Sequence, residues 1–80
     1  MTQVREPIDA TDRYIGGRLL GFRRAMGLQL NDVAHAGAVR PAELAAIEAG
    51  EGKVYMATLW RLCQALQADL EDVLPPEGLH

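Results

Sequence analysis

The sequence has little of what small extracellular or membrane proteins depend on. It holds one cysteine in 80 residues, so no disulfide can form within the chain, and a reducing cytoplasm is the expected setting. No stretch approaches the roughly 20 apolar residues that are needed to span a bilayer. Residues 1–10 also lack the apolar segment of a signal peptide. We therefore predict a cytoplasmic protein that does not associate with a membrane.

The side chains that carry catalysis or bind metals are equally scarce. His35 stands alone on a predicted helix, His80 is the last residue, and Cys63 falls on a predicted core face. Neither a catalytic dyad nor a metal cluster can be assembled from these three residues. There is also no glycine-rich phosphate loop. We expect no cofactor and no metal, and we do not expect an enzyme.

The net charge of −3 is unusual for a protein that binds nucleic acid, but the charge is unevenly distributed. Residues 13–61 contain seven basic and four acidic residues, which gives this segment a net charge of +3. The acidic excess lies before and after it. A mildly basic centre is compatible with DNA binding, and ordinary solvated surface charge remains the alternative explanation.

What is present is a series of apolar residues at helical spacing. Ile15, Leu19, Phe22 and Met26 recur at spacings of three and four residues and would form one apolar face of a helix. This helix is predicted to begin after a cap at Thr11 or Asp12 and to end at Gly27. A short second helix should follow Leu28, and its inward residues should be Leu30, Val33 and Ala34. Gly37 and Ala38 then predict a tight turn.

Three further helices complete the expected chain. The third begins near Arg40, has Pro41 in its first turn and ends at Gly50, with Leu44 and Ile47 facing inward. After a loop, the fourth carries an apolar face at positions i, i+3, i+4 and i+7, formed by Leu59, Leu62, Cys63 and Leu66. Asp69 caps a short fifth helix, which Pro75 and Pro76 end. Helices this short need a shared core, so the fold class is all-α with one compact domain.

This series of residues resembles the phage-repressor-like, or XRE, helix-turn-helix domains. The match runs without a gap from about Ile15 to Leu74 and includes these pieces: Ile15-Gly16, Arg18 to Arg24, Gly27-Leu28, Val33-Ala34, Val39, Leu44, Ile47-Glu48, Gly50, Leu59, Leu62, Ala65-Leu66, Leu70 and Val73-Leu74. The resemblance implies a five-helix, lambda-repressor-like domain over residues 12–75. A flexible arm would precede it at 1–11, and a tail would follow at 76–80.

The resemblance also implies where duplex DNA would bind. The matching positions are Arg40, Pro41, Ala42, Glu43, Ala46 and Lys53. Bases are read mainly by Arg, Lys, Gln and Asn, so the proline and the alanines make this reading face nearly blank. Lys53 matches a loop position that contacts phosphate in phage repressors. Ala38 stands where relatives usually have glycine, which predicts an earlier end of the second helix or a reshaped turn.

Two further sets of residues are assigned by the same resemblance. Arg23 and Glu48 match a partly buried ion pair that ties the first helix to the third, so we assign both to structure. Trp60 lies one place off the apolar face of the fourth helix and is expected to be half exposed. Together with Tyr55 and Met56 it suggests a homodimer surface, although Trp60 at the edge of the core is the alternative.

Two functions remain open. The first is a small XRE-type transcriptional regulator that binds duplex DNA, as a homodimer. The second is a protein-interaction module with the same fold and reduced or lost DNA binding, which acts as a co-regulator or inhibits another regulatory protein. Three features favour the second: the blank face of the third helix, the acidic ends of the chain, and Leu30, expected at an exposed helix start.

Overall fold

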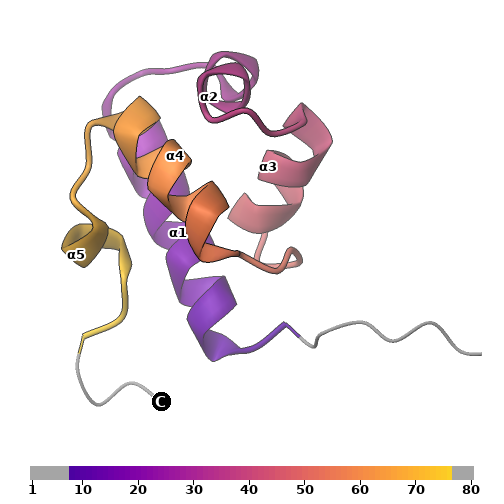
Figure 1. The fold of residues 1–80 in the computed structure, drawn as a ribbon, viewed down its shortest axis with the longest axis vertical. Coiled ribbons are helices and arrows are strands. Elements are labelled where there is room, and N and C mark those ends of the chain that lie inside the picture. Colours follow the sequence, from indigo (N-terminus) through magenta and orange to yellow (C-terminus); the bar gives the residue numbers. More distant parts are fainter. Residues whose placement is uncertain (1–7, 77–80) are drawn as a thin grey trace, which may run out of the picture.

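The structure is a computed structural model that describes residues 8–76. Most of the expected arm and most of the expected tail therefore lie outside the described residues. Within them the chain forms five helices and no strand, which confirms the all-α prediction (Figure 1). The helices are α1 (Ala10–Ala25), α2 (Leu30–Ala36), α3 (Pro41–Glu48), α4 (Met56–Leu66) and α5 (Leu70–Val73).

One apolar core holds the five helices together. Helices α1 and α4 lie side by side, α2 and α3 pack on one side of them, and α5 packs on the other (Figure 1). All helices contribute to the core, whose buried residues are Ile15, Leu19, Val33, Ala34, Leu44, Ile47, Leu59, Leu62, Cys63, Leu66 and Val73. The four residues predicted for the apolar face of α4 are all buried.

The predicted start of α1 needs correction, whereas Gly27 ends the helix as predicted, directly after the C-cap and with a φ of 67°. Its N-cap is Asp9 instead of Thr11 or Asp12, so the helix takes in the last two residues of the expected arm. Asp12 occupies the third helical position and completes a capping box with Asp9. At the other end Met26 is the C-cap and is 43% exposed, although its spacing predicted an inward position. Met26 is therefore not part of the core.

The turn between α2 and α3 keeps its usual form without the usual glycine. Ala38 has a φ of 57°, in the left-handed region that residues other than glycine seldom adopt. The Ala38 N–H donates to His35 O at 3.1 Å, and the Val39 N–H donates to Ala34 O at 2.9 Å. These two bonds are the Schellman motif that ends many helices. The turn is therefore not reshaped, and Ala38 carries the backbone strain.

Gly37 is required for a different reason. It is the C-cap of α2 and has an ordinary φ of −87°. A Cβ atom at this position would lie 2.6 Å from Cδ2 of Leu62, so α4 passes directly over the turn. In addition, the Arg61 Nε donates to the Gly37 carbonyl at 2.8 Å. The glycine in this turn therefore permits the close packing of α2 against α4.

None of the helices in residues 8–76 combines the length and apolar character of a membrane-spanning segment.

Candidate nucleic-acid interface

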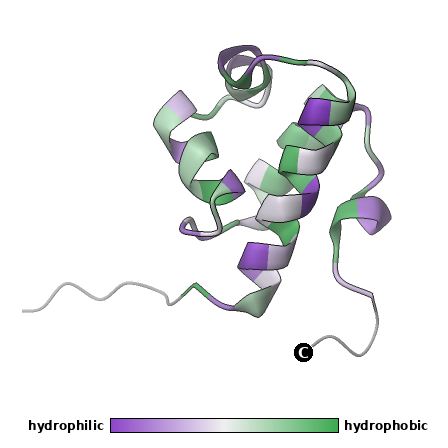
Figure 2. Ribbon diagram, turned by 180° about the vertical axis from the view of Figure 1, so that it is seen from behind, coloured by the Kyte–Doolittle hydropathy of each residue, from purple (hydrophilic) through white to green (hydrophobic). Residues whose placement is uncertain are grey.

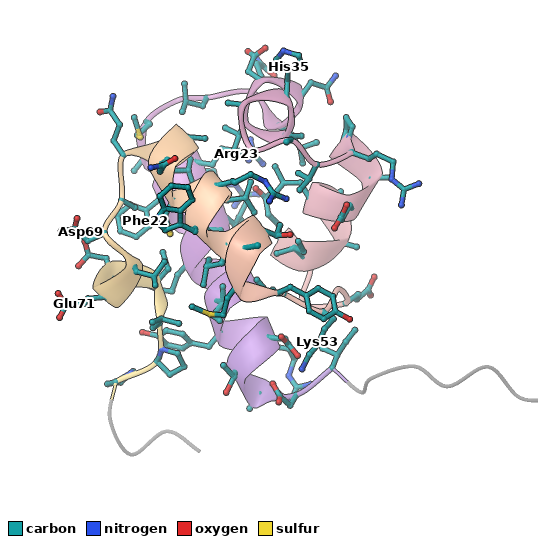
Figure 3. All side chains as sticks on the ribbon, viewed as in Figure 1. Phe22, Arg23, His35, Lys53, Asp69 and Glu71 are labelled. Atoms are coloured by element: carbon teal, nitrogen blue, oxygen red, sulfur yellow. The ribbon has the colours of Figure 1, made fainter. Side chains whose placement is uncertain are left out.

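The inner face of α3 is held firmly against α1. Leu44 and Ile47 are buried, and the next residue, Glu48, receives two hydrogen bonds from Arg23. The distances are 2.7 Å from Nε and 2.9 Å from Nη2, which is the bidentate geometry that strengthens an arginine–carboxylate pair. A further bond from Arg23 Nη1 to Leu28 O lies in the same region between α1 and α3 (Figure 3).

This ion pair is largely removed from solvent. The exposed fractions of the two side chains are 15% for Arg23 and 7% for Glu48. The hydrogen bond to Glu48 raises the pKa of Arg23 above its already high ordinary value, so the guanidinium stays charged. The pair ties the last residue of α3 to α1, and Arg23 also holds the backbone at Leu28.

Gly16 brings α1 and α3 into direct backbone contact. A Cβ atom at Gly16 would lie 1.8 Å from the carbonyl oxygen of Ile47. Any side chain at this position would therefore push α3 away from α1. The neighbouring Gly17 points outward, and a Cβ atom there would meet nothing within 4 Å.

The outer face of α3 is apolar in its chemistry. Pro41, Ala42 and Ala45 are exposed, and α3 is coloured hydrophobic along most of its length (Figure 2). Ala46, which the resemblance places on this face, is half-buried, and Ala45 is the exposed residue instead. Sequence comparison missed Ala45, although its spacing of three from Ala42 was the available signal.

Two polar side chains border this apolar face. Arg40 is the N-cap of α3, and its exposed side chain forms no hydrogen bond or ion pair with another described residue. Glu43 is half-buried in the first turn, and its side chain is likewise without a partner among residues 8–76. From Arg40 to Ala49, Arg40 is the only residue with a side-chain N–H donor.

Most of the basic residues in the central segment stabilise the fold. Arg18 donates to Asp72 O at 2.9 Å and lies over the ring of Phe22, which ties α5 to α1. Arg61 holds the α2–α3 turn, and Arg23 pairs with Glu48. Among the described arginines, those without an intramolecular partner are Arg13, Arg24 and Arg40. The segment thus offers fewer free cations than its net charge suggests.

Lys53 is also engaged with the protein. Its Nζ lies 3.2 Å from Oδ2 of Asp12, beside the start of α1 (Figure 3). Burial raises the pKa of the Asp12 carboxyl, but hydrogen bonds from the backbone N–H groups of Val54 and Asp9, together with Lys53, outweigh it. The pKa of Asp12 therefore lies below its ordinary value of 3.8. This cluster fastens the α3–α4 loop to α1.

The start of α2 does not present an apolar contact surface. Leu30 is half-buried and packs against the core, whereas the preceding N-cap, Gln29, is exposed. This removes one of the three observations that favoured a protein-interaction module.

A separate apolar patch lies at the start of α4. Tyr55, Met56 and Trp60 are 55%, 58% and 56% exposed. Met56 and Trp60 are four residues apart and therefore share one face of the helix. We refer to these three residues as the α4 patch. Trp60 is thus outside the core.

The described residues offer little for catalysis. Burial raises the pKa of the Cys63 thiol, and the nearby carboxylates of Asp69 and Asp72 add to the effect. The thiol is thus protonated and unreactive at neutral pH. His35 is exposed at the surface of α2 (Figure 3), and His80 lies outside the described residues. Within residues 8–76 no three His, Cys, Asp or Glu side chains gather as a metal site would require.

Comparison with solved structures identifies several regulators of the same fold. The clp gene regulator ClgR of Corynebacterium glutamicum is 34% identical, with a TM-score of 0.77, over 85% of this chain and 86% of that one. An HTH_3 family transcriptional regulator of Vibrio cholerae is 32% identical, with a TM-score of 0.74, over 79% of this chain and 35% of that one.

A third similar structure is the restriction-modification controller protein C.AhdI of Aeromonas hydrophila. It covers 82% of this chain and all of its own, with a TM-score of 0.77, but its identity of 23% supports the fold alone. Searches with family models and among curated proteins give no match. The identity and coverage of ClgR are sufficient to place the chain: it belongs to the XRE-type (HTH_3) helix-turn-helix family of transcriptional regulators.

Proposed function

We propose that this protein is a cytoplasmic transcriptional regulator that binds duplex DNA as a homodimer, with α3 in the major groove. The observation that carries the proposal is the 34% identity with ClgR over 85% of this chain. The geometry supports it, since α3 is fixed on its inner side and open on its outer side. A helix held in this way fits the major groove, which admits one α-helix.

Phosphate contacts would come from few groups. Arg40 lies at the start of α3 with its guanidinium unpaired, and α3 has no side-chain cap, which leaves backbone N–H groups of its first turn open. Both kinds of group bind phosphate at helix N-termini. Lys53 is already paired with Asp12, so its contribution would require that pair to open. We therefore expect binding that depends only moderately on salt.

The α4 patch is the proposed dimer surface. Exposed tryptophan, tyrosine and methionine are enriched in protein interfaces, and these three residues lie within six positions of the chain. A two-fold dimer would present two copies of α3 to half-sites about one helical turn apart, roughly 34–36 Å. The proposed operator is accordingly a palindrome.

DNA binding is tested by selecting duplexes from a random library at low salt and titrating the best one over a salt series. Each phosphate contact contributes a slope of about −0.9 to log K against log salt. We expect Arg40→Ala in a dimer to reduce the slope by about 2. Arg24→Ala removes an equally unpaired charge outside α2 and α3 and should change the slope less. Failure to select any duplex would refute the proposal.

Dimerisation is tested with the single tryptophan. Its emission should shift to shorter wavelength as the protein concentration rises, because Trp60 becomes buried in the dimer, and sedimentation should report two protomers. Trp60→Glu should give a monomer. Met26→Glu introduces the same charge at an exposed methionine outside the α4 patch and should remain dimeric. A wild-type protein that sediments as a monomer at high concentration would contradict the proposed homodimer.

The protein-interaction module remains a second candidate because the outer face of α3 lacks hydrogen-bond donors. It makes the opposite prediction for the selection experiment, in which no duplex is enriched. It also predicts stoichiometric capture of a protein partner that is lost in Ala45→Glu. Capture that does not change in this variant would rule out α3 as the contact surface.

A further inference from the structure

The exposed residues of α3 limit which bases it can recognise. Guanine and adenine are identified in the major groove by side chains that donate paired hydrogen bonds. Between Arg40 and Ala49 the only such donor is Arg40, and it lies at the N-cap, before the first helical residue. Of the two carboxylates of α3, Glu48 is occupied by Arg23, and the other, Glu43, accepts hydrogen bonds but donates none.

The remaining chemistry on this face is methyl groups. Ala42 and Ala45 are both exposed and three residues apart, so their Cβ atoms lie on the same side of the helix. With Pro41 beside them, no long side chain holds the helix away from the groove floor. In the major groove the matching apolar feature is the C5-methyl group of thymine.

We infer that α3 recognises thymine methyl groups through Ala42 and Ala45, so that the operator half-site carries thymine opposite the middle of α3. This inference rests on the proposed function, because it concerns the same face of α3. It adds the class of base that is recognised and the contact type, which is apolar instead of hydrogen-bonded.

The inference has a measurable size. Burial of one methyl group between the helix and a base should strengthen binding about fourfold, which corresponds to ~0.8 kcal/mol. Two methyl groups in one half-site would give on the order of tenfold. Deoxyuridine is the suitable probe, because it keeps every hydrogen-bonding group of thymidine and lacks only the methyl group.

The experiment begins with the best duplex from the selection described above. Each thymine in one half-site is replaced singly by deoxyuridine, and the dissociation constant is measured with the wild-type protein. One or two positions should lose affinity about fourfold each. Thymines outside the half-sites serve as internal controls and should show no loss.

A protein variant then assigns the contact. In Ala45→Gly the methyl group on the protein side is absent, so the penalty for deoxyuridine at the facing position should disappear. Ala25→Gly is the matched control: it removes the same methyl group at an exposed position of α1, in the shallow groove that also includes Phe22. Phe22 lies on the α5 side of the molecule, away from α3 (Figure 3). In this control the penalty should persist.

The possible outcomes separate the two proposals. A selected duplex without thymine in its half-sites, or one whose deoxyuridine forms all bind as tightly as the parent, overturns the inference and leaves DNA binding intact. A deoxyuridine penalty that persists unchanged in both Ala45→Gly and Ala42→Gly also overturns it. If no duplex is selected at all, the proposed function fails and the inference fails with it.

Discussion

The two faces of α3 are built under different constraints. The inner face is specified residue by residue: Leu44 and Ile47 are buried, Glu48 is bonded twice to Arg23, and Gly16 of α1 touches the backbone of Ile47. The outer face carries proline and alanine, which make no specific side-chain contact in the structure. Both faces belong to a helix of eight residues.

This difference separates what identifies the fold from what determines the ligand. The inner face explains why the chain folds like its relatives, since those residues set the position of α3. The outer face is free to vary without cost to the fold. Substitutions on the inner face should therefore change the free energy of unfolding, and substitutions on the outer face should change binding alone.

Gly16→Ala is expected to lower the free energy of unfolding more than any other substitution considered. Its new methyl group would overlap the Ile47 carbonyl, so α1 and α3 would have to separate, at a cost of about 3 kcal/mol or more. Gly17→Ala is the control, since an exposed helical glycine replaced by alanine should stabilise by about 0.5–1 kcal/mol. Urea unfolding of both variants checks this. Equal changes in stability for the two substitutions would contradict the close approach of α1 and α3 at Gly16.

Breaking the ion pair between Arg23 and Glu48 should cause the second largest loss of stability. Glu48→Ala leaves the Arg23 guanidinium partly buried with only Leu28 O as acceptor, and we expect a loss of about 2–4 kcal/mol. The double variant Arg23→Met with Glu48→Leu should recover much of that loss, because no buried charge remains. Chemical denaturation of the single and double variants gives the coupling free energy between Arg23 and Glu48. Additive losses would show that the two side chains act independently.

Asp12 predicts a specific dependence on pH. Its pKa in the folded protein lies below the unfolded value, so its stabilising contribution is fully present above about pH 4 and is lost as the pH falls toward the folded-state pKa. Asp12→Asn should lower the free energy of unfolding at neutral pH by about 1–2 kcal/mol. Thermal unfolding from pH 7 to pH 2 should show the difference from wild type shrinking below pH 4. A constant difference would contradict this account.

The smallest effect concerns the turn that leads into α3. Ala38→Gly should stabilise the protein by about 1 kcal/mol, because glycine adopts the left-handed conformation without the Cβ penalty. The adjacent Gly37→Ala should destabilise it instead, since its methyl group meets Leu62. Melting temperatures of the two variants should thus move in opposite directions. A shift of the same sign in both would contradict the roles assigned to the two residues.

Periodicity was sufficient to predict the helices and most of the core. The apolar face of α4 was correct at all four residues, because helical spacing alone determines which side is inward. At Met26 the same reasoning was wrong, since this residue is the C-cap of α1 and lies exposed at the surface. Asp9 was missed as the N-cap because Asp12 is an equally good capping residue in sequence.

Tertiary contacts decided the features that sequence left open. Gly37 lies beneath Leu62, so the residue required there depends on the position of α4, which the local sequence does not contain. The left-handed position of this turn falls on Ala38 and not on the adjacent glycine. In the same way, the net charge of the central segment did not reveal that Arg18 and Lys53 are held by α5 and by Asp12. Side-chain partners far apart in sequence are visible only in the folded chain.

The most direct test of the central claim compares Ala45→Glu with the wild type in two assays, affinity for the selected duplex and thermal stability. The account predicts at least a tenfold loss of affinity, since the longer, charged side chain would stand between α3 and the base edges and would add negative charge inside the groove, with stability unchanged within about 0.5 kcal/mol. Ala25→Glu should bind normally. An Ala45→Glu protein that binds the duplex as tightly as wild type would contradict the assignment of this face to DNA.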